Sequence, residues 1–399
     1  MAMPLDGIRV IDWTIWQQGP ICSVLLADLG AEVIKLESRE GGDPGRSIVT
    51  GAGDKPNFYF EANNRNKKSL TVDLKQQEAR ELVHRLVARS DVFVQNFRKG
   101  VPARLGLDYA TLRQHNEKLI YASATGYGPE GPDSGEPSFD HLGLARSGIM
   151  LAAGEPDMDP LGIAGGVADQ MGGIVLAYGI LAALLARERL GVGQQVDGSH
   201  LGSMTLLQGL SVSAKGMMGF SLPRTARTSA PNPLWNHYRC EDGKWLALGM
   251  LQPDRYWADL CRAIGRPELA DDERYATHAV RAGNAAEVVA IFDQVFASKP
   301  RDEWLRTLRD QPGDFIYTLV NRVDDLLDDP QVRANDYVID FEHPRCGKTR
   351  VLGMPVRLSE TPGSVRTAAP GHGEHTDEIL RELGYDADAI RDLRERKVV

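Results

Sequence analysis

One carboxylate in this chain, that of Asp169, has neighbours that suit covalent chemistry. It is the only acid between residues 159 and 188, and it lies at the start of a long apolar run. Aspartate is among the side chains that enzymes use as nucleophiles to form covalent intermediates. On a helix, residues three and four positions away share its face. Those positions hold Gly165, Gly166, Gly172 and Gly173.

Glycine inside a helix costs roughly 1 kcal/mol relative to alanine, so these glycines need a reason. Two interpretations stay open from the residues alone. In the first, the glycines leave bare backbone, which lets a bulky ligand or a partner helix approach the carboxylate closely. In the second, they serve tight packing, and Asp169 caps the first helical turn or forms a salt bridge.

Motifs for several other chemistries are absent from the sequence. The first strand-to-helix turn, TIWQQGPICS, has one glycine, whereas a dinucleotide site needs GxGxxG. Neither a Walker phosphate loop nor a GxSxG nucleophile elbow occurs. Four scattered cysteines form no CxxC pair and no zinc spacing with histidine. We therefore expect reduced thiols, no metal and no redox cofactor.

The composition limits the kinds of partner. The formal net charge is −9, which disfavours nucleic acid, because a phosphate-binding surface has to be basic. An anionic ligand would need a local basic cluster. The N-terminus lacks the layout of a signal peptide, and the apolar run at 172–186 is shorter than the roughly 20 residues that a bilayer requires. We expect a buried helix there, no membrane association and a cytoplasmic location.

Strand and helix patterns alternate in the first part of the chain. Five strands are predicted, at residues 8–14, 32–38, 69–74, 91–97 and 119–127. Strands and helices that alternate in this way build an α/β fold with an open, doubly wound parallel sheet of the Rossmann type. Ligands in such folds bind beyond the carboxyl ends of the strands. A long helix predicted at about 168–189 would carry Asp169 near its start.

A change of character after about Gly219 predicts a second, smaller domain. The segment SLPRTARTSAPNP has the composition of a linker. A hairpin signal, EDG, and three amphipathic helical patterns follow it. We predict a large α/β domain from residues 1–224 and 326–399, and a small α+β domain from residues 225–325.

Several motifs, in order, resemble the family III CoA transferases of the CaiB/BaiF type, which include formyl-CoA and carnitine CoA transferases. They are PLDGIRVIDWTIWQQGPICSVLLADLGAEVIKLES, NRNKKSLTVDLK, DVFVQNFRKGVPARLGLDY, AYGILAALLARERLGVGQQVD and PGHGEHTDEIL. The resemblance spans nearly the whole chain. It implies an open α/β domain made from both chain ends, a small domain between them, and a homodimer of two interlocked chains.

The resemblance also implies a reaction. In this family the nucleophile is the aspartate of a D-x-x-G-G segment, which is Asp169 here. CoA would move from an acyl-CoA donor, such as succinyl-CoA, to a carboxylic acid through anhydride and thioester intermediates on Asp169. Backbone amides of the glycine-rich segments are candidates for oxyanion stabilisation. CoA and acyl-CoA are substrates, and no permanently bound cofactor is implied.

A set of CoA-binding positions follows from the same resemblance. Lys75, Arg98 and Arg104 suit the phosphates, and Phe97 or the backbone near Leu74 suits the adenine. Formyl-CoA members have arginine where this chain has a serine, directly before Arg39. The complete set is Gln17, Gln18, Arg39, Val72, Asp73, Leu74, Lys75, Asn96, Phe97, Arg98, Arg104 and Asp140.

Two alternatives stay open. An α-methylacyl-CoA racemase of the same fold needs a histidine directly before Asp140, where this chain has Phe139, and His141 lies on the other side. Two-base proton transfer then lacks one of its bases, which favours CoA transfer. The second alternative is a CoA-binding protein without catalytic activity.

The motifs do not determine the acyl groups. Formyl-CoA:oxalate members carry a glycine run in the loop that enters the small domain, whereas this chain has SAPNPLWNHYRCEDG. This departure argues against oxalate and leaves dicarboxylates, aromatic acids and carnitine-like acids open. Trp235, His237 and Tyr238 either line the acyl pocket or pack at the domain junction. His372 and His375 are expected in a structural loop.

Overall fold

The structure is a computed structural model that describes residues 2–48 and 56–399. The chain divides into two compact units. Unit 1 runs to Met150 and resumes over Gly162–Ser221 and Pro330–Val399, and unit 2 comprises Leu151–Leu161 and Leu222–Asp329. The predicted domain boundaries at 225 and 325 stay a prediction.

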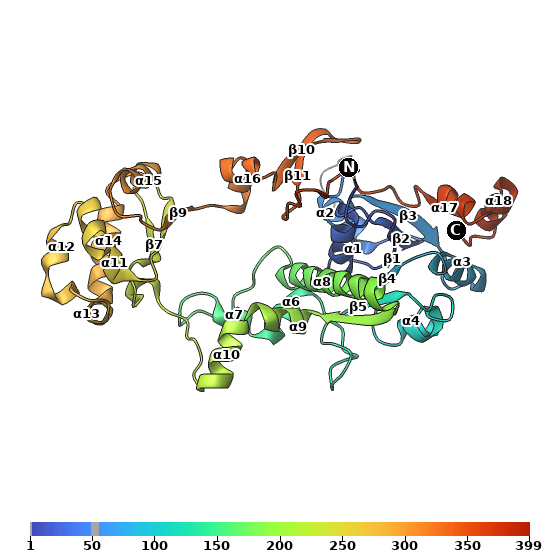
Figure 1. The fold of residues 1–399 in the computed structure, drawn as a ribbon, viewed down its shortest axis with the longest axis horizontal. Coiled ribbons are helices and arrows are strands. Elements are labelled where there is room, and N and C mark those ends of the chain that lie inside the picture. Colours follow the sequence, from blue (N-terminus) through green and yellow to red (C-terminus); the bar gives the residue numbers. More distant parts are fainter. Residues whose placement is uncertain (1, 49–55) are drawn as a thin grey trace. The chain divides into compact units, whose positions relative to one another are not determined.

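Unit 1 is built on a six-stranded parallel sheet (Figure 1). Its strands are β1 (Arg9–Trp13), β2 (Glu32–Ser38), β3 (Lys67–Val72), β4 (Val92–Gln95), β5 (Ile120–Thr125) and β6 (Gln194–Ser199). They lie in the order β3-β2-β1-β4-β5-β6, and every neighbouring pair is parallel. The predicted open parallel sheet is confirmed, and its sixth strand, β6, is one that the sequence patterns do not indicate.

Alternate side chains of the strands enter two hydrophobic cores, one on each face of the sheet. In β1, Ile11 and Trp13 belong to one core and Val10 to the other. Runs of buried aliphatic residues on both faces are typical of parallel sheets that helices cover on both sides. The strand ends are therefore the part of the sheet left open to a ligand.

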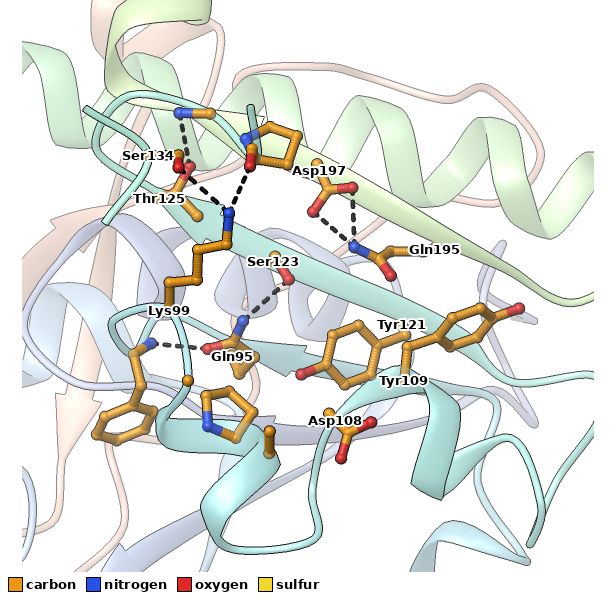
Figure 2. A pocket seen from close by; sticks show the side chains of 16 residues that line it. Gln95, Lys99, Asp108, Tyr109, Tyr121, Ser123, Thr125, Ser134, Gln195 and Asp197 are labelled. Atoms are coloured by element: carbon orange, nitrogen blue, oxygen red, sulfur yellow. Dashed lines mark hydrogen bonds between the residues drawn. The ribbon is translucent and has the colours of Figure 1, made fainter. Parts of the chain in front are cut away.

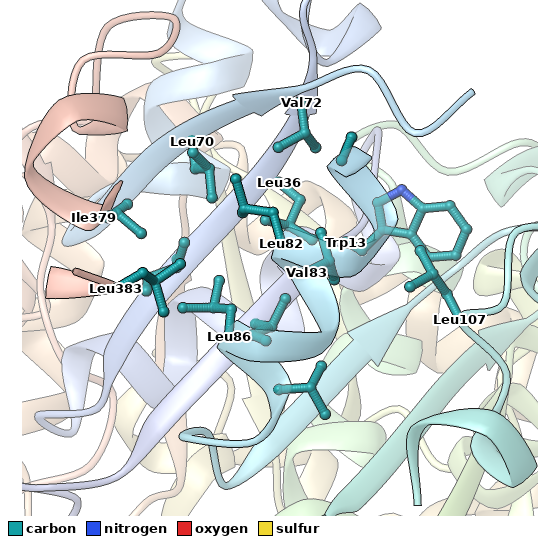
Figure 3. Packing of buried hydrophobic residues seen from close by; sticks show 14 of the residues in the cluster. Trp13, Leu36, Leu70, Val72, Leu82, Val83, Leu86, Leu107, Ile379 and Leu383 are labelled. Carbon is teal, nitrogen blue, oxygen red and sulfur yellow. The ribbon is translucent and has the colours of Figure 1, made fainter. Parts of the chain in front are cut away.

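Three helices from the two ends of the chain cover the first face. They are α3 (Gln77–Val87), α17 (Thr376–Glu382) and α18 (Ala387–Glu395). Figure 3 shows Leu82 of α3 in the same cluster as Ile379 of α17. The C-terminal segment is thus part of the core of unit 1.

The opposite face is covered by α1 (Gln18–Asp28) and α8 (Val167–Leu190). A Cβ added at Gly172 would lie 2.7 Å from Gln18 Nε2, and one added at Gly173 would lie 2.6 Å from Ile21 Cγ2. The glycines therefore let α1 approach α8, and they leave no room there for a ligand. The tight-packing interpretation holds for these two positions.

The helix α8 is 24 residues long, longer than the apolar run that the sequence analysis considered. By length and composition it could cross a membrane, with a mean hydropathy of 1.6 in its most apolar window, of which 44% is buried. The core helix of a globular domain has the same composition. Its packing against α1 and the sheet accounts for the apolar character of its buried side.

The other helices of unit 1 connect or flank these elements. They are α2 (Phe58–Asn64), α4 (Val101–Arg104), α5 (Tyr109–Leu112), α6 (Asp140–Ser147), α9 (His200–Leu207), α10 (Gly209–Met218) and α16 (Pro330–Ala334), with α7 (Ile149–Ala152) at the boundary of the units. A hairpin of β10 (Val338–His343) and β11 (Gly347–Leu352) precedes the C-terminal helices.

Unit 2 has an antiparallel sheet of β7 (Trp235–Arg239), β8 (Trp245–Gly249) and β9 (Tyr317–Val320). Its helices are α11 (Pro253–Ala263), α12 (Glu268–Asp271), α13 (His278–Gly283), α14 (Ala285–Phe296) and α15 (Arg301–Asp310). Tyr238 is fully buried and donates to the Pro233 carbonyl, so it serves packing. Trp235 and His237 instead line a cleft of about 1000 Å³ in this unit.

Candidate active site

The strand order of the sheet reverses between β1 and β4. In open parallel sheets this point forms a crevice in which ligands bind. Here reciprocal hydrogen bonds join the two strand ends. The Ile15 N–H donates to Asn96 Oδ1 at 2.9 Å, and Asn96 Nδ2 donates to the Ile15 carbonyl at 2.7 Å. The floor of the crevice is therefore fixed.

Trp16 continues this floor in a strained conformation. Its φ is 66°, a left-handed value that costs a non-glycine residue about 1–3 kcal/mol. Its N–H donates to Asp43 Oδ1 at 3.1 Å, and its ring meets Phe139 edge-on with centroids 6.0 Å apart. The contacts hold the tryptophan ring at the wall of the crevice.

Buried charged residues support the loop that carries Trp16. Lys35 Nζ lies 2.8 Å from Asp43 Oδ2 and donates to the Thr14 carbonyl at 2.8 Å. Lys67 Nζ lies 2.8 Å from Asp12 Oδ2. Burial alone would raise the pKa of Asp12, but the two lysines lower it to about 2. Burial lowers the pKa of Lys67 to about 8, although Asp12 acts in the opposite direction. Removing one partner of such a pair would leave a buried charge uncompensated.

A cleft of about 750 Å³ opens at these strand ends. Trp16, Phe97 and Phe139 contribute aromatic rings to its wall, while Arg98 and Lys99 contribute positive charge. Its carboxylates and imidazoles come from Glu136, Asp140, His141, Asp169 and His200. The cleft thus combines an apolar wall, cations and a potential nucleophile.

Asp169 lies in the first turn of α8, which begins after Gly166 in a left-handed conformation with φ of 73°. A Cβ at Gly166 would lie 2.4 Å from Gln17 Oε1. Asp140 Oδ1 caps the helix from outside, because it accepts from the Ala168 N–H at 2.7 Å and from the Asp169 N–H at 3.1 Å. The Asp169 side chain is 14% exposed and lines the cleft.

His200 is a site residue that the sequence analysis missed. It begins α9 directly after β6, and it is 3% exposed. Its Nε2 lies 2.8 Å from Asp169 Oδ1, and its Nδ1 lies 3.2 Å from Ser138 Oγ. The Ser138 hydroxyl, the His200 imidazole and the Asp169 carboxylate are therefore linked in a chain of hydrogen bonds. The position of His200 directly after a strand end could have indicated a ligand-binding residue, but only if β6 had been predicted.

Tyr59, on α2, also lines the cleft. Burial, together with the charges of Asp169, Asp43 and Asp140, raises the pKa of its hydroxyl. A phenol with a raised pKa stays protonated at neutral pH and can donate a hydrogen bond. The carboxylate thus has a neutral, donating neighbour in the cleft.

Several predicted CoA-binding residues lie in the cleft with Asp169. They are Gln18, Asn96, Phe97, Arg98 and Asp140. Gln17 lies beside them, where its Nε2 donates to the Gly165 carbonyl at 3.4 Å. The ring of Phe97 stacks on Trp13 with centroids 4.1 Å apart, so one face of this ring is already covered.

The remaining predicted contacts lie outside this cleft, after β2, after β3 and on α4. They are Arg39, Val72, Asp73, Leu74, Lys75 and Arg104. Val72 is 2% exposed and packs in the core at the end of β3, so it offers a ligand almost no surface. The Asp73 N–H donates to the Val398 carbonyl at 2.8 Å, which ties this turn to the C-terminus. Lys75 and Arg104 are exposed.

A second cavity, of about 200 Å³, is lined by residues of β4, β5 and β6 and by the loops that follow β4 and β5 (Figure 2). Lys99 borders both this cavity and the cleft. Its Nζ donates to the Pro129 carbonyl at 3.1 Å and to Ser134 Oγ at 3.2 Å, and Figure 2 shows the side chain reaching up to these acceptors. Through these hydrogen bonds Lys99 therefore stabilises the loop that leads to Phe139.

The two C-terminal histidines have structural partners. His372 Nε2 lies 2.9 Å from the Ser38 carbonyl, and the Ser69 N–H donates to His375 Nδ1 at 3.3 Å. Within residues 2–48 and 56–399, no group of three metal-ligating side chains gathers at one place. These contacts join the C-terminal loop to β2 and β3.

Comparisons with known proteins bear on this site. The family model described as CoA-transferase family III matches residues 5–376. The chain is 32% identical over 402 residues to (R)-2-hydroxy-4-methylpentanoate CoA-transferase of Clostridioides difficile, covering 100% of each protein. It is 34% identical over 404 residues to the succinyl-CoA–L-malate CoA-transferase beta subunit of Chloroflexus aurantiacus, covering 100% of this chain and 98% of that one. A solved CaiB/BaiF family protein from Brucella suis matches with a TM-score of 0.86 at 31% identity, over 96% of this chain and 100% of that one.

Proposed function

The chain belongs to CoA-transferase family III, and from this premise we propose that it moves CoA from an acyl-CoA to a carboxylic acid through covalent intermediates on Asp169. It is accordingly an enzyme, a CoA-transferase whose substrates are acyl-CoA and a carboxylic acid. The role of Asp169 and the identity of the acyl groups are the proposed parts.

One observation carries the role of Asp169. Its carboxylate lines the cleft at the point where the strand order reverses, and one of its oxygens is held by a buried imidazole. A carboxylate that is largely shielded from solvent, as Asp169 is, can act as a nucleophile towards an activated carbonyl. The thioester of an acyl-CoA is such a carbonyl.

The proposed first step is attack by one oxygen of Asp169 on the thioester carbonyl carbon. A carbon–oxygen bond forms, the carbon–sulfur bond breaks, and the electron pair leaves with CoA as a thiolate. The negative charge passes from the carboxylate to sulfur, and no proton is transferred. The enzyme then carries a mixed anhydride.

The remaining steps repeat this exchange at two carbonyl carbons. The thiolate attacks Cγ of Asp169, which releases the donor acid and leaves an enzyme–CoA thioester. The acceptor carboxylate attacks this thioester to give a second anhydride and free the thiolate. The thiolate finally attacks the acceptor acyl carbon, which gives the new acyl-CoA and restores the Asp169 carboxylate.

The phosphates of CoA need cations in a chain whose formal net charge is −9. Arg98 and Lys99 line the cleft, and Lys75 and Arg104 are exposed at neighbouring positions beyond it. We propose Arg98, Lys75 and Arg104 as the phosphate ligands, because arginine and lysine bind phosphate through charge-assisted hydrogen bonds.

The wall of the cleft bears on the acyl group. Trp16 and Phe139 meet edge-on, and Tyr59 lines the same cleft. Aromatic rings favour an apolar or partly apolar acyl chain. The two relatives named above have 2-hydroxy-4-methylpentanoate and L-malate in their names. We therefore propose 2-hydroxy acids, together with simple dicarboxylates, as the acceptors to test first.

A homodimer is the second proposal, and it rests on α10. α10 has no buried residue, and it exposes Leu210, Val212, Met217 and Met218. Large exposed apolar patches mark protein–protein interfaces. The family resemblance supplies the partner, a second copy of this chain interlocked with the first.

One observation favours the racemase alternative. His141 lines the cleft with Asp169, so an imidazole is available there although Phe139 holds the position of the racemase histidine. Exchange of the α-proton of a 2-methylacyl-CoA for solvent deuterium, without any acceptor acid, would favour this function over CoA transfer.

The proposed function is tested by a mass-spectrometric screen. The purified protein is mixed with succinyl-CoA or acetyl-CoA and a panel of 2-hydroxy acids, dicarboxylates, aromatic acids and carnitine-like acids. We expect a new acyl-CoA mass with at least one acid, and none with Asp169→Ala. Turnover by that variant would contradict the role of Asp169, and binding of CoA without any turnover would indicate a non-catalytic protein.

A further inference from the structure

Two of the proposed steps place a negative charge on one oxygen of Asp169. When a thiolate or a carboxylate attacks Cγ, the electron pair of the carbonyl bond moves onto the oxygen that is not exchanged. Such an oxyanion is stabilised by a fixed N–H or O–H donor at about 3 Å. The proposed function therefore requires a donor beside Asp169.

Backbone amides of the glycine-rich segment are the donors expected from the sequence, but the amides around Asp169 are occupied. The N–H groups of Ala168 and Asp169 donate to Asp140 Oδ1. The N–H of Gln170 donates to the Gly166 carbonyl at 2.8 Å. These three amides are committed to the start of α8, so the donor has to come from elsewhere.

His200 supplies an N–H at the required place. Its Nε2 lies 2.8 Å from Asp169 Oδ1. An ionised carboxylate can only accept hydrogen bonds, so Nε2 must carry a proton. No hydrogen bond from the described residues reaches the other oxygen, Oδ2, which belongs to a side chain that lines the cleft.

Ser138 can partner Nδ1 in both charge states of the imidazole, while Nε2 keeps the proton that the Asp169 carboxylate requires. Its Oγ lies 3.2 Å from His200 Nδ1 and 3.3 Å from the Phe139 carbonyl. When the ring is neutral, the hydroxyl donates to Nδ1. When the ring is cationic, the hydroxyl accepts from Nδ1–H and donates to the carbonyl instead. In either case Nε2–H faces Asp169.

Packing fixes the ring before any ligand arrives. His200 is 3% exposed. A Cβ added at Gly143, on α6, would lie 2.9 Å from both His200 Cβ and Ala168 Cβ, so α6 approaches the two elements as closely as glycine allows. An oxyanion donor is most effective when it is fixed in advance.

We propose that His200 is a catalytic residue that stabilises negative charge on Asp169 Oδ1, while Asp169 Oδ2 forms and breaks the bond to the acyl carbon. Oδ2 forms the bond to the donor acyl carbon, and it leaves with the donor acid when the thiolate attacks Cγ. Oδ1 stays on Asp169, takes the electron pair of the carbonyl bond and accepts the hydrogen bond from Nε2–H. The Nε2 proton is shared with Oδ1 and is not transferred. This inference rests on the proposed function.

Two amide substitutions that differ in reach provide the test. In His200→Gln the amide nitrogen falls near the position of Nε2, whereas in His200→Asn it falls near Nδ1 and does not reach Asp169. Loss of an oxyanion donor slows catalysis roughly 100-fold or more. We expect this loss for His200→Asn, and a loss of about tenfold or less for His200→Gln. His115→Asn, at an exposed histidine away from the cleft, is the matched control.

The readout is a half-reaction that separates the two carbonyl carbons. Enzyme is mixed with saturating succinyl-CoA, or with the donor found in the screen, without acceptor acid, and it is quenched at short times. Peptide mass spectrometry then counts acyl anhydride and CoA thioester on Asp169. We expect His200→Asn to accumulate the anhydride and to form the thioester slowly, with the concentration of acyl-CoA for half-saturation little changed.

Each outcome either supports or overturns the role of His200. Equal thioester rates in the Asn and Gln variants, or a wild-type rate in His200→Asn, would overturn the role of His200 while leaving Asp169 as the nucleophile. A wild-type enzyme that transfers CoA without any adduct on Asp169 would overturn both proposals. Thermal unfolding of all variants shows whether the Asn and Gln proteins are equally folded, and the Gln/Asn ratio is read from that matched pair.

Discussion

Replacing Gly173 with alanine tests whether contact between helix backbones holds α8 against α1. The added Cβ would lie 2.6 Å from Ile21 Cγ2 and 2.8 Å from the Gln18 carbonyl oxygen. Because the carbonyl belongs to the backbone, it cannot swing aside, and one helix has to move. Overpacking costs typically about 1–3 kcal/mol, and alanine gains about 1 kcal/mol over glycine in a helix. We expect a net loss of up to about 2 kcal/mol in the free energy of unfolding.

The same substitution should reduce activity, because Asp169 lies one helical turn before Gly173 on α8. A shift of about 1 Å in a catalytic group can cost roughly 100-fold in rate. We expect kcat to fall by roughly tenfold to 100-fold, with little change in KM for acyl-CoA.

Two other glycines provide controls for this measurement. A Cβ at Gly172 would meet Gln18 Nε2 first, which is a side-chain atom and can move more easily than the carbonyl that faces Gly173, so Gly172→Ala should cost less stability than Gly173→Ala. Gly283 is exposed at the end of α13, with no described atom within 4 Å of an added Cβ, and its alanine variant should gain up to about 1 kcal/mol. Urea unfolding gives the order, and a Gly173→Ala protein as stable as Gly283→Ala would refute the close contact.

Three further predictions concern the helix cap, the buried charges and the dimer. Asp140→Ala should lower the free energy of unfolding by about 0.5–2 kcal/mol, because α8 loses its external cap. Asp140→Asn keeps a hydrogen-bond acceptor and should lose less. If urea unfolding gave the same loss of stability for both variants, the capping role of Asp140 would be contradicted. Burial alone would raise the pKa of Glu37, but Arg46 and other neighbours lower it from 4.5 to about 2. The ionised carboxylate therefore stabilises the fold above about pH 4.5, and about 3 kcal/mol of this stabilisation is lost as the pH falls towards 2. The free energy of unfolding of Glu37→Gln should therefore change less between pH 4.5 and pH 2 than that of the wild-type protein. An equal change in both proteins would exclude this contribution. Leu210→Glu or Met217→Glu, on the exposed face of α10, should reduce the dimer fraction in sedimentation, and unaltered dimers would remove α10 from the interface.

The sequence predicted the sheet well where strands are buried on both faces. Strands β1, β2, β4 and β5 are buried over most of their length, and they lie close to the predicted ranges. The edge strand β6 reads QQVDGS and has exposed side chains at alternate positions, and Val196 is its single β-branched residue, so its composition does not mark it as a strand. An edge strand of this composition can be recognised only through its pairing with β5.

The candidate site was predictable only in part, because several of its contacts join distant residues. Asp169 could be identified from its neighbours and the family motif, but His200 follows a strand that the sequence does not indicate, and its bond to Asp169 spans 31 positions. The ion pair between Lys67 and Asp12 joins residues 55 positions apart. Lys67 lies before the predicted strand at 69–74, and a lysine is normally expected to face solvent. The glycines after Asp169 were explained only by the position of α1.

The identity of the residue that carries the covalent intermediate tests the central claim most directly. The purified enzyme is incubated with succinyl-CoA, or with the donor found in the screen, without acceptor acid, quenched with hydroxylamine and digested. Peptide mass spectrometry then locates the hydroxamate. We expect it on Asp169 in the wild-type enzyme and not in Asp169→Asn. CoA transfer with no modification of Asp169, or with the hydroxamate on another carboxylate of the cleft such as Asp140, would contradict the proposed mechanism.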